Sequence, residues 1–209
     1  KNIFLMGQMF PKNSIDVDKL KIVEDQNEKW SGGVLAGNGK IYGIPYNSSK
    51  VLILDSYDSS IEMIETNQSG LGKYSSGILA NNGKIYCIPY NSNQILIINP
   101  ETKEVSYITS NLLNLTSKYM GGVLSNGRIY CIPYNSNQVL IINTNNNNVS
   151  VISSVLNSGI GKWAGGALAP NGKIYCSPYN STSILIIDTI TNTLSAIQYI
   201  QGSEKWCGA

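Results

Sequence analysis

An internal repeat restricts the fold of this sequence more strongly than any other feature. A lysine followed by an aromatic residue and a run of small residues recurs every 43 to 45 residues. These restart pairs are Lys29-Trp30, Lys73-Tyr74, Lys118-Tyr119, Lys162-Trp163 and Lys205-Trp206. A Pro-Tyr-Asn triplet follows each of the first four, ending at Asn47, Asn91, Asn135 and Asn180. A fixed period of this length predicts a series of equal units that pack on one another.

Each unit carries the pattern of four short strands, which we call a to d. An Asn-Gly pair predicts a tight hairpin turn between strands a and b. Strand c is an uninterrupted apolar run such as Ile95–Ile98, whereas strand d alternates, as in Val105–Ile108. An uninterrupted run indicates a strand with both faces covered. Four strands in a repeat of about 40–45 residues are typical of a propeller blade. We therefore predict an all-β propeller of four-stranded blades.

The two ends of the chain complete this picture. The whole repeats span about 30–73, 74–118, 119–162 and 163–205, within a single domain over 1–209. Residues 1–29 resemble strands b, c and d without strand a, and 206–209 begin another strand a. We therefore predict five blades, with a composite closing blade that removes the free sheet edges. The alternative is a fragment of a longer array, because the last strand a stops at Ala209.

The repeat resembles the YVTN-type propeller repeat, on Pro170–Tyr175 and Ile184–Thr189. It is still more similar to a Lys-Trp-x-Gly-Gly-Val-Leu-Ala-Pro-Asn-Gly-Lys-Ile-Tyr-Gly-Ile-Pro-Tyr-Asn subfamily, whose members are mostly uncharacterised proteins of protists and large DNA viruses. The resemblance covers nearly the whole chain beyond residue 28 and implies the propeller fold. It implies no particular activity, because propellers include lectins, scaffolds, lyases and hydrolases. Sugar-binding proteins of the tachylectin-2 type share the predicted blade count, but no motif.

The restart pairs and the triplets predict one candidate binding face. In a propeller the d-to-a and b-to-c connections lie on the same face, so both motifs fall there, near the axis. The candidate ligand-binding residues are Lys29, Trp30, Lys73, Tyr74, Lys118, Tyr119, Lys162, Trp163, Lys205, Trp206, Asn47, Asn91, Asn135 and Asn180. Aromatic faces beside amides suit sugar rings, and lysines favour an anion. The alternative is packing, with aromatic wedges between blades, Pro-Tyr under the next strand a, and Asn capping its own turn.

The cysteines predict neither a disulfide nor a metal site. Cys87, Cys131 and Cys176 occupy the same place in successive copies of strand b. Equivalent positions in neighbouring sheets lie about 10 Å or more apart, and a disulfide needs Cα atoms within about 7 Å. The sequence contains no histidine and no Cys-x-x-Cys, so we expect no zinc site and no cofactor. Reduced thiols and the lack of a recognisable signal peptide favour a reduced intracellular compartment or a virus particle over secretion.

The composition argues against several functions. The lack of histidine removes the commonest general base and every Ser-His or Cys-His pair. Glycosidase chemistry needs two facing carboxylates. The first suspects are Glu28 and Glu204, although the lysines beside them favour ionised carboxylates. A net charge of +2 without a basic stripe argues against nucleic acid. The sequence contains no apolar run of about 20 residues, so we expect no membrane insertion.

These observations predict a non-catalytic binding or structural scaffold module. We expect it to hold a protein partner or a glycan on the face that carries the restart pairs, including as a component of a larger assembly or virion. The first alternative is a multivalent lectin, whose weak equivalent sites would gain strength by avidity. The second alternative is a hydrolase or lyase on a propeller scaffold, which the missing histidine disfavours.

Overall fold

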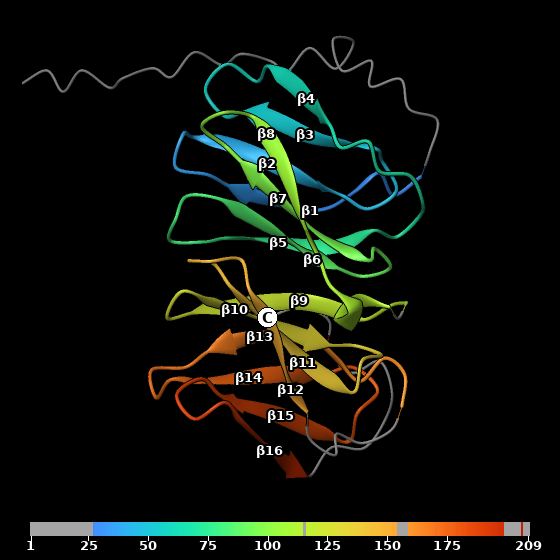
Figure 1. Cartoon of the computed structure of the whole chain (residues 1–209), viewed down its shortest axis with the longest axis vertical. Coiled ribbons are helices and arrows are strands. Elements are labelled where there is room, and N and C mark those ends of the chain that lie inside the picture. Colours follow the sequence, from blue (N-terminus) through green and yellow to red (C-terminus); the bar gives the residue numbers. More distant parts are fainter. Residues whose placement is uncertain (1–26, 115, 154–158, 199–205, 207–209) are drawn as a thin grey trace, which may run out of the picture.

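The computed structural model describes residues 27–114, 116–153, 159–198 and Trp206. The described residues form four antiparallel sheets of four strands each, and within each sheet every strand pairs with the next in sequence. The sheets succeed one another from β4 at one end of Figure 1 to β16 at the other. Each sheet corresponds to one predicted repeat, so the prediction of an all-β propeller with four-stranded blades is confirmed. The composite closing blade lies outside the described residues, and the count of five blades stays a prediction.

Strands a to d follow the same order in every described blade. The first two blades contain β1 (Trp30–Leu35), β2 (Lys40–Pro45), β3 (Lys50–Asp55), β4 (Ile61–Glu65), β5 (Tyr74–Leu79), β6 (Ile85–Pro89), β7 (Gln94–Asn99) and β8 (Glu104–Thr109). A short 3-10 helix, η2 (Asn111–Leu113), lies in the connection to the third blade. The last two contain β9 (Tyr119–Ser125), β10 (Arg128–Pro133), β11 (Gln138–Asn143), β12 (Val149–Ser153), β13 (Trp163–Leu168), β14 (Lys173–Pro178), β15 (Ser183–Asp188) and β16 (Thr193–Gln198).

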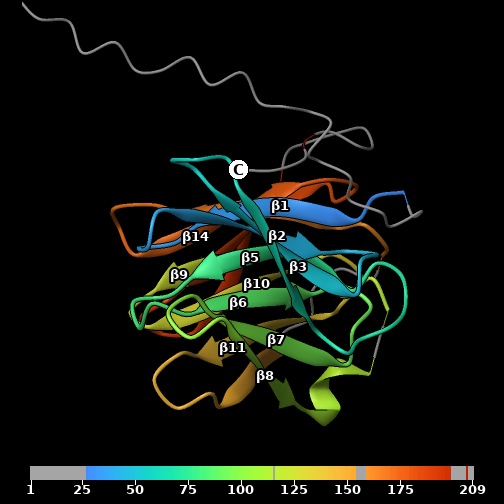
Figure 2. The same cartoon turned by 90° about the horizontal axis from the view of Figure 1, so that it is seen from above.

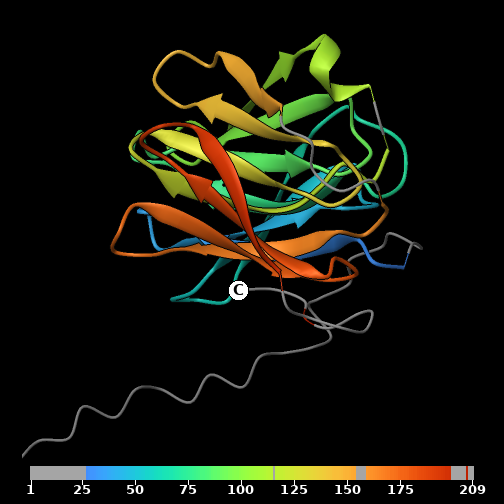
Figure 3. The ribbon, with the colours of Figure 1, turned by 90° about the horizontal axis from the view of Figure 1, so that it is seen from below.

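The innermost strands of neighbouring blades lie side by side. Figure 2 shows β1, β5 and β9 in succession, and Figure 3 shows the same stack from the opposite side. Glycine permits this close approach, because a Cβ on Gly121 of β9 would lie 3.1 Å from the Cα of Gly165 of β13. Gly121 also has a φ of +88°, which L side chains rarely adopt. The small residues of strand a therefore let the blades meet closely at the axis.

The hydrophobic core lies between neighbouring blades. In the two middle blades the central residues of β7 and β11 are all buried, as the uninterrupted apolar run predicts. In β3 and β15 burial alternates, and Leu52, Leu54, Ile184 and Ile186 are half-buried. These two strands belong to the first and last described blades, and each of those blades has a single described neighbour. Complete burial of strand c therefore requires a blade on both sides.

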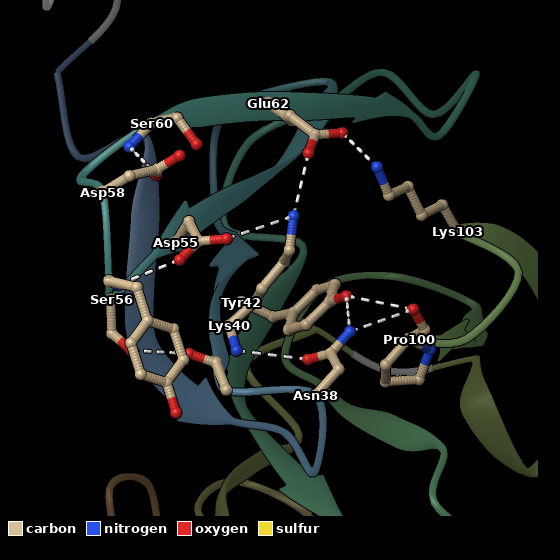
Figure 4. Close-up of polar contacts among 12 residues, drawn as sticks. Asn38, Lys40, Tyr42, Asp55, Ser56, Asp58, Ser60, Glu62, Pro100 and Lys103 are labelled. Atoms are coloured by element: carbon tan, nitrogen blue, oxygen red, sulfur yellow. Dashed lines mark hydrogen bonds and ion pairs between the residues drawn. The ribbon is translucent and has the colours of Figure 1, made fainter.

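One end of the molecule carries the a–b and c–d turns, and we call it the turn face. A repeated contact connects neighbouring blades there. The hydroxyl of Tyr42 on β2 donates to the carbonyl of Pro100 in the next blade at 3.3 Å. The side-chain amide of Asn38 donates to the Tyr42 hydroxyl and to the same carbonyl (Figure 4). The equivalent contacts run from Tyr86 to Thr144 and from Tyr130 to Thr189. The Asn-Gly turn and the tyrosine of strand b thus connect each blade to the next one.

Candidate functional site

The opposite end carries the d-to-a and b-to-c connections, and we call it the tyrosine face. Its restart aromatics Tyr74, Tyr119 and Trp163 are buried. The indole Nε1 of Trp163 donates to the carbonyl of Ser183 at the start of β15, at 2.8 Å. These side chains pack in the cores between neighbouring blades rather than forming an exposed ring, as the packing alternative predicts. Their burial leaves them no surface for a ligand. Trp30 is half-buried, and Trp206 is half exposed.

The restart lysines Lys73, Lys118 and Lys162 are also buried. The Nζ of Lys73 donates to the carbonyl of Gly70 at 3.0 Å and to that of Tyr46 in the preceding blade at 3.2 Å. The Nζ of Lys162 donates to the carbonyls of Gly159 and Asn135 in the same way. The expected lysine ring at the channel mouth is therefore replaced by lysines that tie neighbouring blades together. Lys29 is half-buried, and Lys205 lies outside the described residues.

Burial has an electrostatic consequence for these lysines. It lowers the pKa of Lys118 to about 8, because the charged ammonium loses its hydration. It also lowers the pKa of Lys162. The carbonyl oxygens around Lys73 and Lys162 replace part of the lost hydration. The charge of these three lysines is therefore held within the protein and is not presented to solvent.

The asparagines of the Pro-Tyr-Asn triplets bond to the loops that enter the blades. The Oδ1 of Asn91 accepts from the backbone N–H of Ser117 in the next blade at 2.8 Å, and its Nδ2 donates to the carbonyl of Leu71 at 3.1 Å. Asn47 bridges Gly72 and Asn27 in the same way. Asn135 accepts from Gly161 N–H in the next blade, and Asn180 donates to the Ile160 carbonyl in the loop that enters its own blade. These amides thus bond to d-to-a loops rather than to their own turn.

The tyrosines of the same triplets form the feature that the sequence-based list of candidates missed. Tyr46, Tyr90, Tyr134 and Tyr179 lie next to one another across the four blades, with ring centroids 6.1, 6.0 and 5.7 Å apart. We call this row the tyrosine arc. Its spacing falls within the favourable range for aromatic pairs. All four side chains are half-buried, unlike the restart aromatics. Their recurrence at the end of strand b is the signal in the sequence that points to them. The packing alternative placed Pro-Tyr under the next strand a, so the tyrosines were not among the candidate ligand-binding residues.

A cavity of about 340 Å³ opens beside the tyrosine arc. Its lining residues are Glu28, Trp30, Ser31, Tyr46, Ser75, Tyr90, Met120 and Tyr134. The hydroxyl of Ser31 donates to the carbonyl of Ser75 at 2.8 Å, so it is engaged between two inner strands. Aromatic residues therefore make up half of the lining residues, together with one carboxylate, two serines and a methionine. The volume lies at the lower end of the range for small-ligand pockets.

Two positions of the repeat that contribute to the cavity wall differ among the copies. The residue after the restart aromatic is Ser31, Ser75, Met120 and Ala164 in successive blades. The residue before the restart lysine is Glu28, Gly72, Ser117 and Gly161. By contrast, the lysines and the triplet residues are the same in every copy. Variable positions in a repeat were the signal in the sequence that could have located this cavity.

The charged residues of the described chain offer little for catalysis. Glu28 is the one charged side chain that lines the cavity among the described residues, and Glu204 lies outside them. At the turn face, Lys40 pairs with Glu62 at 3.0 Å and with Asp55 at 3.5 Å (Figure 4). Hydrogen bonds from Lys103, and then Lys40, lower the pKa of Glu62. Glu62 is therefore held as an ionised partner of two lysines and is a poor proton donor.

Cys87, Cys131 and Cys176 are free and buried. Burial raises the pKa of each of these thiols, so the reactive thiolate is disfavoured. Within the described ranges, no group of three or more His, Cys, Asp or Glu residues is placed to hold a metal ion. None of the described helices is long and apolar enough to cross a membrane.

No protein-family model and no curated protein matches this sequence. Solved structures do match. A streptogramin B lyase superposes with a TM-score of 0.73 at 16% identity, covering 88% of this chain and 60% of that one. A virginiamycin B lyase from Staphylococcus aureus gives 0.70 at 14%, covering 83% and 57%. The WD40 repeats of RRP9 give 0.63 at 9%, covering 84% and 52%.

These similarities support the propeller fold. At such low identity they say nothing of activity. This chain spans 60% or less of the length of each of the three structures. The resemblance to the YVTN-type repeat and its subfamily stays a prediction.

Proposed function

We propose that this chain is a non-catalytic binding module that holds a partner on its tyrosine face. The observation that carries the proposal is the cavity beside the tyrosine arc, whose described wall holds Trp30, three tyrosines and one carboxylate beside two serines and a methionine. Such a wall supplies contact area and orientation, and its described residues provide no pair of groups for acid–base chemistry. The restart lysines and the triplet asparagines are engaged with loop groups, whereas the tyrosines of the arc line the cavity.

The comparison with the lyases also favours a non-catalytic role. One matching structure is a catalytically inactive histidine-to-alanine variant of virginiamycin B lyase with quinupristin. This chain contains no histidine at all. Glycoside hydrolysis would need a second carboxylate opposite Glu28, and the described cavity wall offers none. The similarity to the lyases therefore supports the fold and not their reaction.

Exposed apolar side chains on the d-to-a connections favour a protein partner. Leu71, Leu112 and Ile160 lie on these connections in three blades, and 68%, 38% and 76% of their surfaces are exposed. Exposed apolar side chains on the face that carries an aromatic depression are typical of protein interfaces. We therefore place this module as a scaffold component of a larger assembly. A glycan is the second candidate, because tyrosine rings can stack against sugars.

Site-specific photo-crosslinking in an extract of the native source tests this proposal. A photoreactive residue replaces Leu71 on the tyrosine face or, as the matched control, Ile190 on the turn face, which is 77% exposed. We expect an adduct from position 71, none from position 190, and loss of the adduct when Tyr90→Ala is added to a chain that still folds. Equal adducts from both faces, or an adduct that survives Tyr90→Ala, would refute the proposal. A glycan array with the same variants identifies the second candidate by a signal that Tyr90→Ala removes.

A further inference from the structure

We propose that the cavity of the tyrosine face binds a quaternary ammonium group, with Glu28 as its counter-ion. The inference rests on the proposed function and names the chemical class that the same site recognises. Such a group is a bulky, weakly hydrated cation carried by a ligand or a partner. Three features of the wall lead to it: its aromatic character, its single negative charge and the unfavourable backbone conformation of Glu28.

The aromatic character of the wall suits a cation. Trp30, Tyr46, Tyr90 and Tyr134 contribute rings from two motifs of the repeat. The face of an aromatic ring carries partial negative charge and attracts a cation within about 6 Å of its centroid. Burial, the neighbouring Tyr90 and the charge of Glu28 raise the pKa of Tyr46, so this phenol stays neutral. Several neutral rings around one small space are the arrangement that recognises alkylated ammonium groups.

A sugar would find fewer partners here. Hydroxyl groups need donors and acceptors in fixed positions, and the amides nearest the arc are engaged. Asn47 and Asn91 each bond to two loops, and the Ser31 hydroxyl donates to the Ser75 carbonyl. A quaternary ammonium group donates no hydrogen bond, so it needs only ring faces and a counter-charge. The wall matches this requirement more closely than that of a neutral polyol.

The charge of the wall has the sign that a cation requires. Glu28 lines the cavity, its side chain is exposed, and its charge acts on the neighbouring Tyr46. The nearby lysines do not line the cavity. Lys73 and Lys162 direct their ammonium groups at loop carbonyls instead. The negative charge of Glu28 therefore lines the cavity, while the ammonium groups of Lys73 and Lys162 lie within the loops between blades.

The backbone of Glu28 is the third feature. Its φ is 53°, and the equivalent residues Gly72, Ser117 and Gly161 have φ values of 60°, 47° and 63°. The repeat thus requires a left-handed conformation here, which favours glycine over residues with a Cβ. Glutamate occurs at this position in the described copy that lines the cavity. A side chain kept against the local backbone preference is expected where function requires it.

Fluorine NMR of protein labelled with 5-fluorotryptophan tests the inference on the full chain. Trp30 lines the cavity, whereas Trp163 is buried in the core between two blades and serves as the internal control. The probes are choline and its neutral carbon isostere 3,3-dimethylbutan-1-ol, with signals assigned by Trp→Phe variants. We expect choline to shift the Trp30 signal in a saturable way and to leave Trp163 unchanged. The neutral isostere should bind at least about tenfold more weakly, since it lacks the charge that the rings and the carboxylate attract.

Variants at position 28 separate ligand binding from folding. Glu28→Gln keeps the size of the side chain and should weaken choline binding about tenfold or more. Glu28→Gly should also lose binding while the denaturation midpoint stays equal or rises, because glycine suits this φ. The matched control is Ser117→Gly, which makes the same backbone change away from the cavity and should bind choline normally.

Several outcomes would overturn the inference. Equal affinity for choline and its isostere, or full choline affinity in Glu28→Gln, would show that the charge is not recognised. Absence of any shift of the Trp30 signal would show that choline does not bind in the cavity. If crosslinking from position 71 still depends on Tyr90, the binding function stands and the ligand class alone is wrong. If that dependence fails as well, the proposed function falls with it.

Discussion

The turn face and the tyrosine face both connect neighbouring blades, but they differ in which residues recur from blade to blade. At the turn face, each described pair of neighbouring blades is connected by the hydroxyl of a strand b tyrosine and a c–d turn carbonyl. At the tyrosine face, lysines and asparagines also connect blades, but the residues beside them change from Glu28 to Gly72 to Ser117. The cavity thus combines tyrosines that repeat in every blade with residues that vary, such as Glu28 and Met120. Substitutions at the two faces should therefore differ in their effect on stability and on binding.

The largest effect is expected from two tryptophans at one position of the repeat. Trp163 is buried in the core between the last two described blades, whereas Trp30 is half-buried beside the cavity. Trp163→Ala should cost about 3–5 kcal/mol of unfolding free energy, as large-to-small core substitutions do. Trp30→Ala should cost clearly less and abolish choline binding. Urea denaturation of both variants checks the order, and equal losses of stability would contradict it.

A smaller difference is expected between the contacts of the two faces. Asn91→Ala removes two hydrogen bonds: the one that the Oδ1 of Asn91 accepts from Ser117 N–H, and the one that its Nδ2 donates to the Leu71 carbonyl. Tyr86→Phe removes one hydroxyl from the turn face. We expect losses of about 1–3 kcal/mol for Asn91→Ala and about 0.5–1.5 kcal/mol for Tyr86→Phe. Chemical denaturation of the two variants measures both, and the reverse order would show that the turn face contributes more to joining blades.

The smallest effect is a pH dependence that arises from Lys118. Burial lowers the pKa of Lys118 to about 8, below its ordinary value of 10.5. Below pH 8 the folded chain holds a charged, poorly hydrated ammonium, and the full destabilisation is present. Between pH 8 and about 10.5 the unfolded chain binds more protons than the folded chain, so stability rises with pH. The urea midpoint of the wild type should therefore rise from pH 7.5 to 9.5. Lys118→Met should reduce that rise, and an unchanged slope would contradict this assignment.

The fold could be predicted because its determinants are local and repeated. The Asn-Gly pair specifies the a–b hairpin, and Gly83 in that turn has a φ of 76° that closes it. The apolar run Ile95–Ile98 predicted a strand covered on both faces, and it is buried throughout. The candidate site was harder to predict. Lysines and aromatics look like surface ligands in a sequence, and only contacts with distant residues show otherwise. The Nζ of Lys73, for example, donates to a carbonyl 27 residues earlier.

The sequence by itself determined the blade, its four strands and the face on which the restart pairs and triplets lie, because these follow from a period and from turn residues. The tertiary structure decided which of those residues are buried. Because neighbouring blades approach closely, Lys73 and Asn91 bond to loops of adjacent blades, and Trp163 is buried in the core between two blades. The tyrosine arc exists only in three dimensions: rings some 44 residues apart in sequence lie about 6 Å apart once the blades pack around the axis.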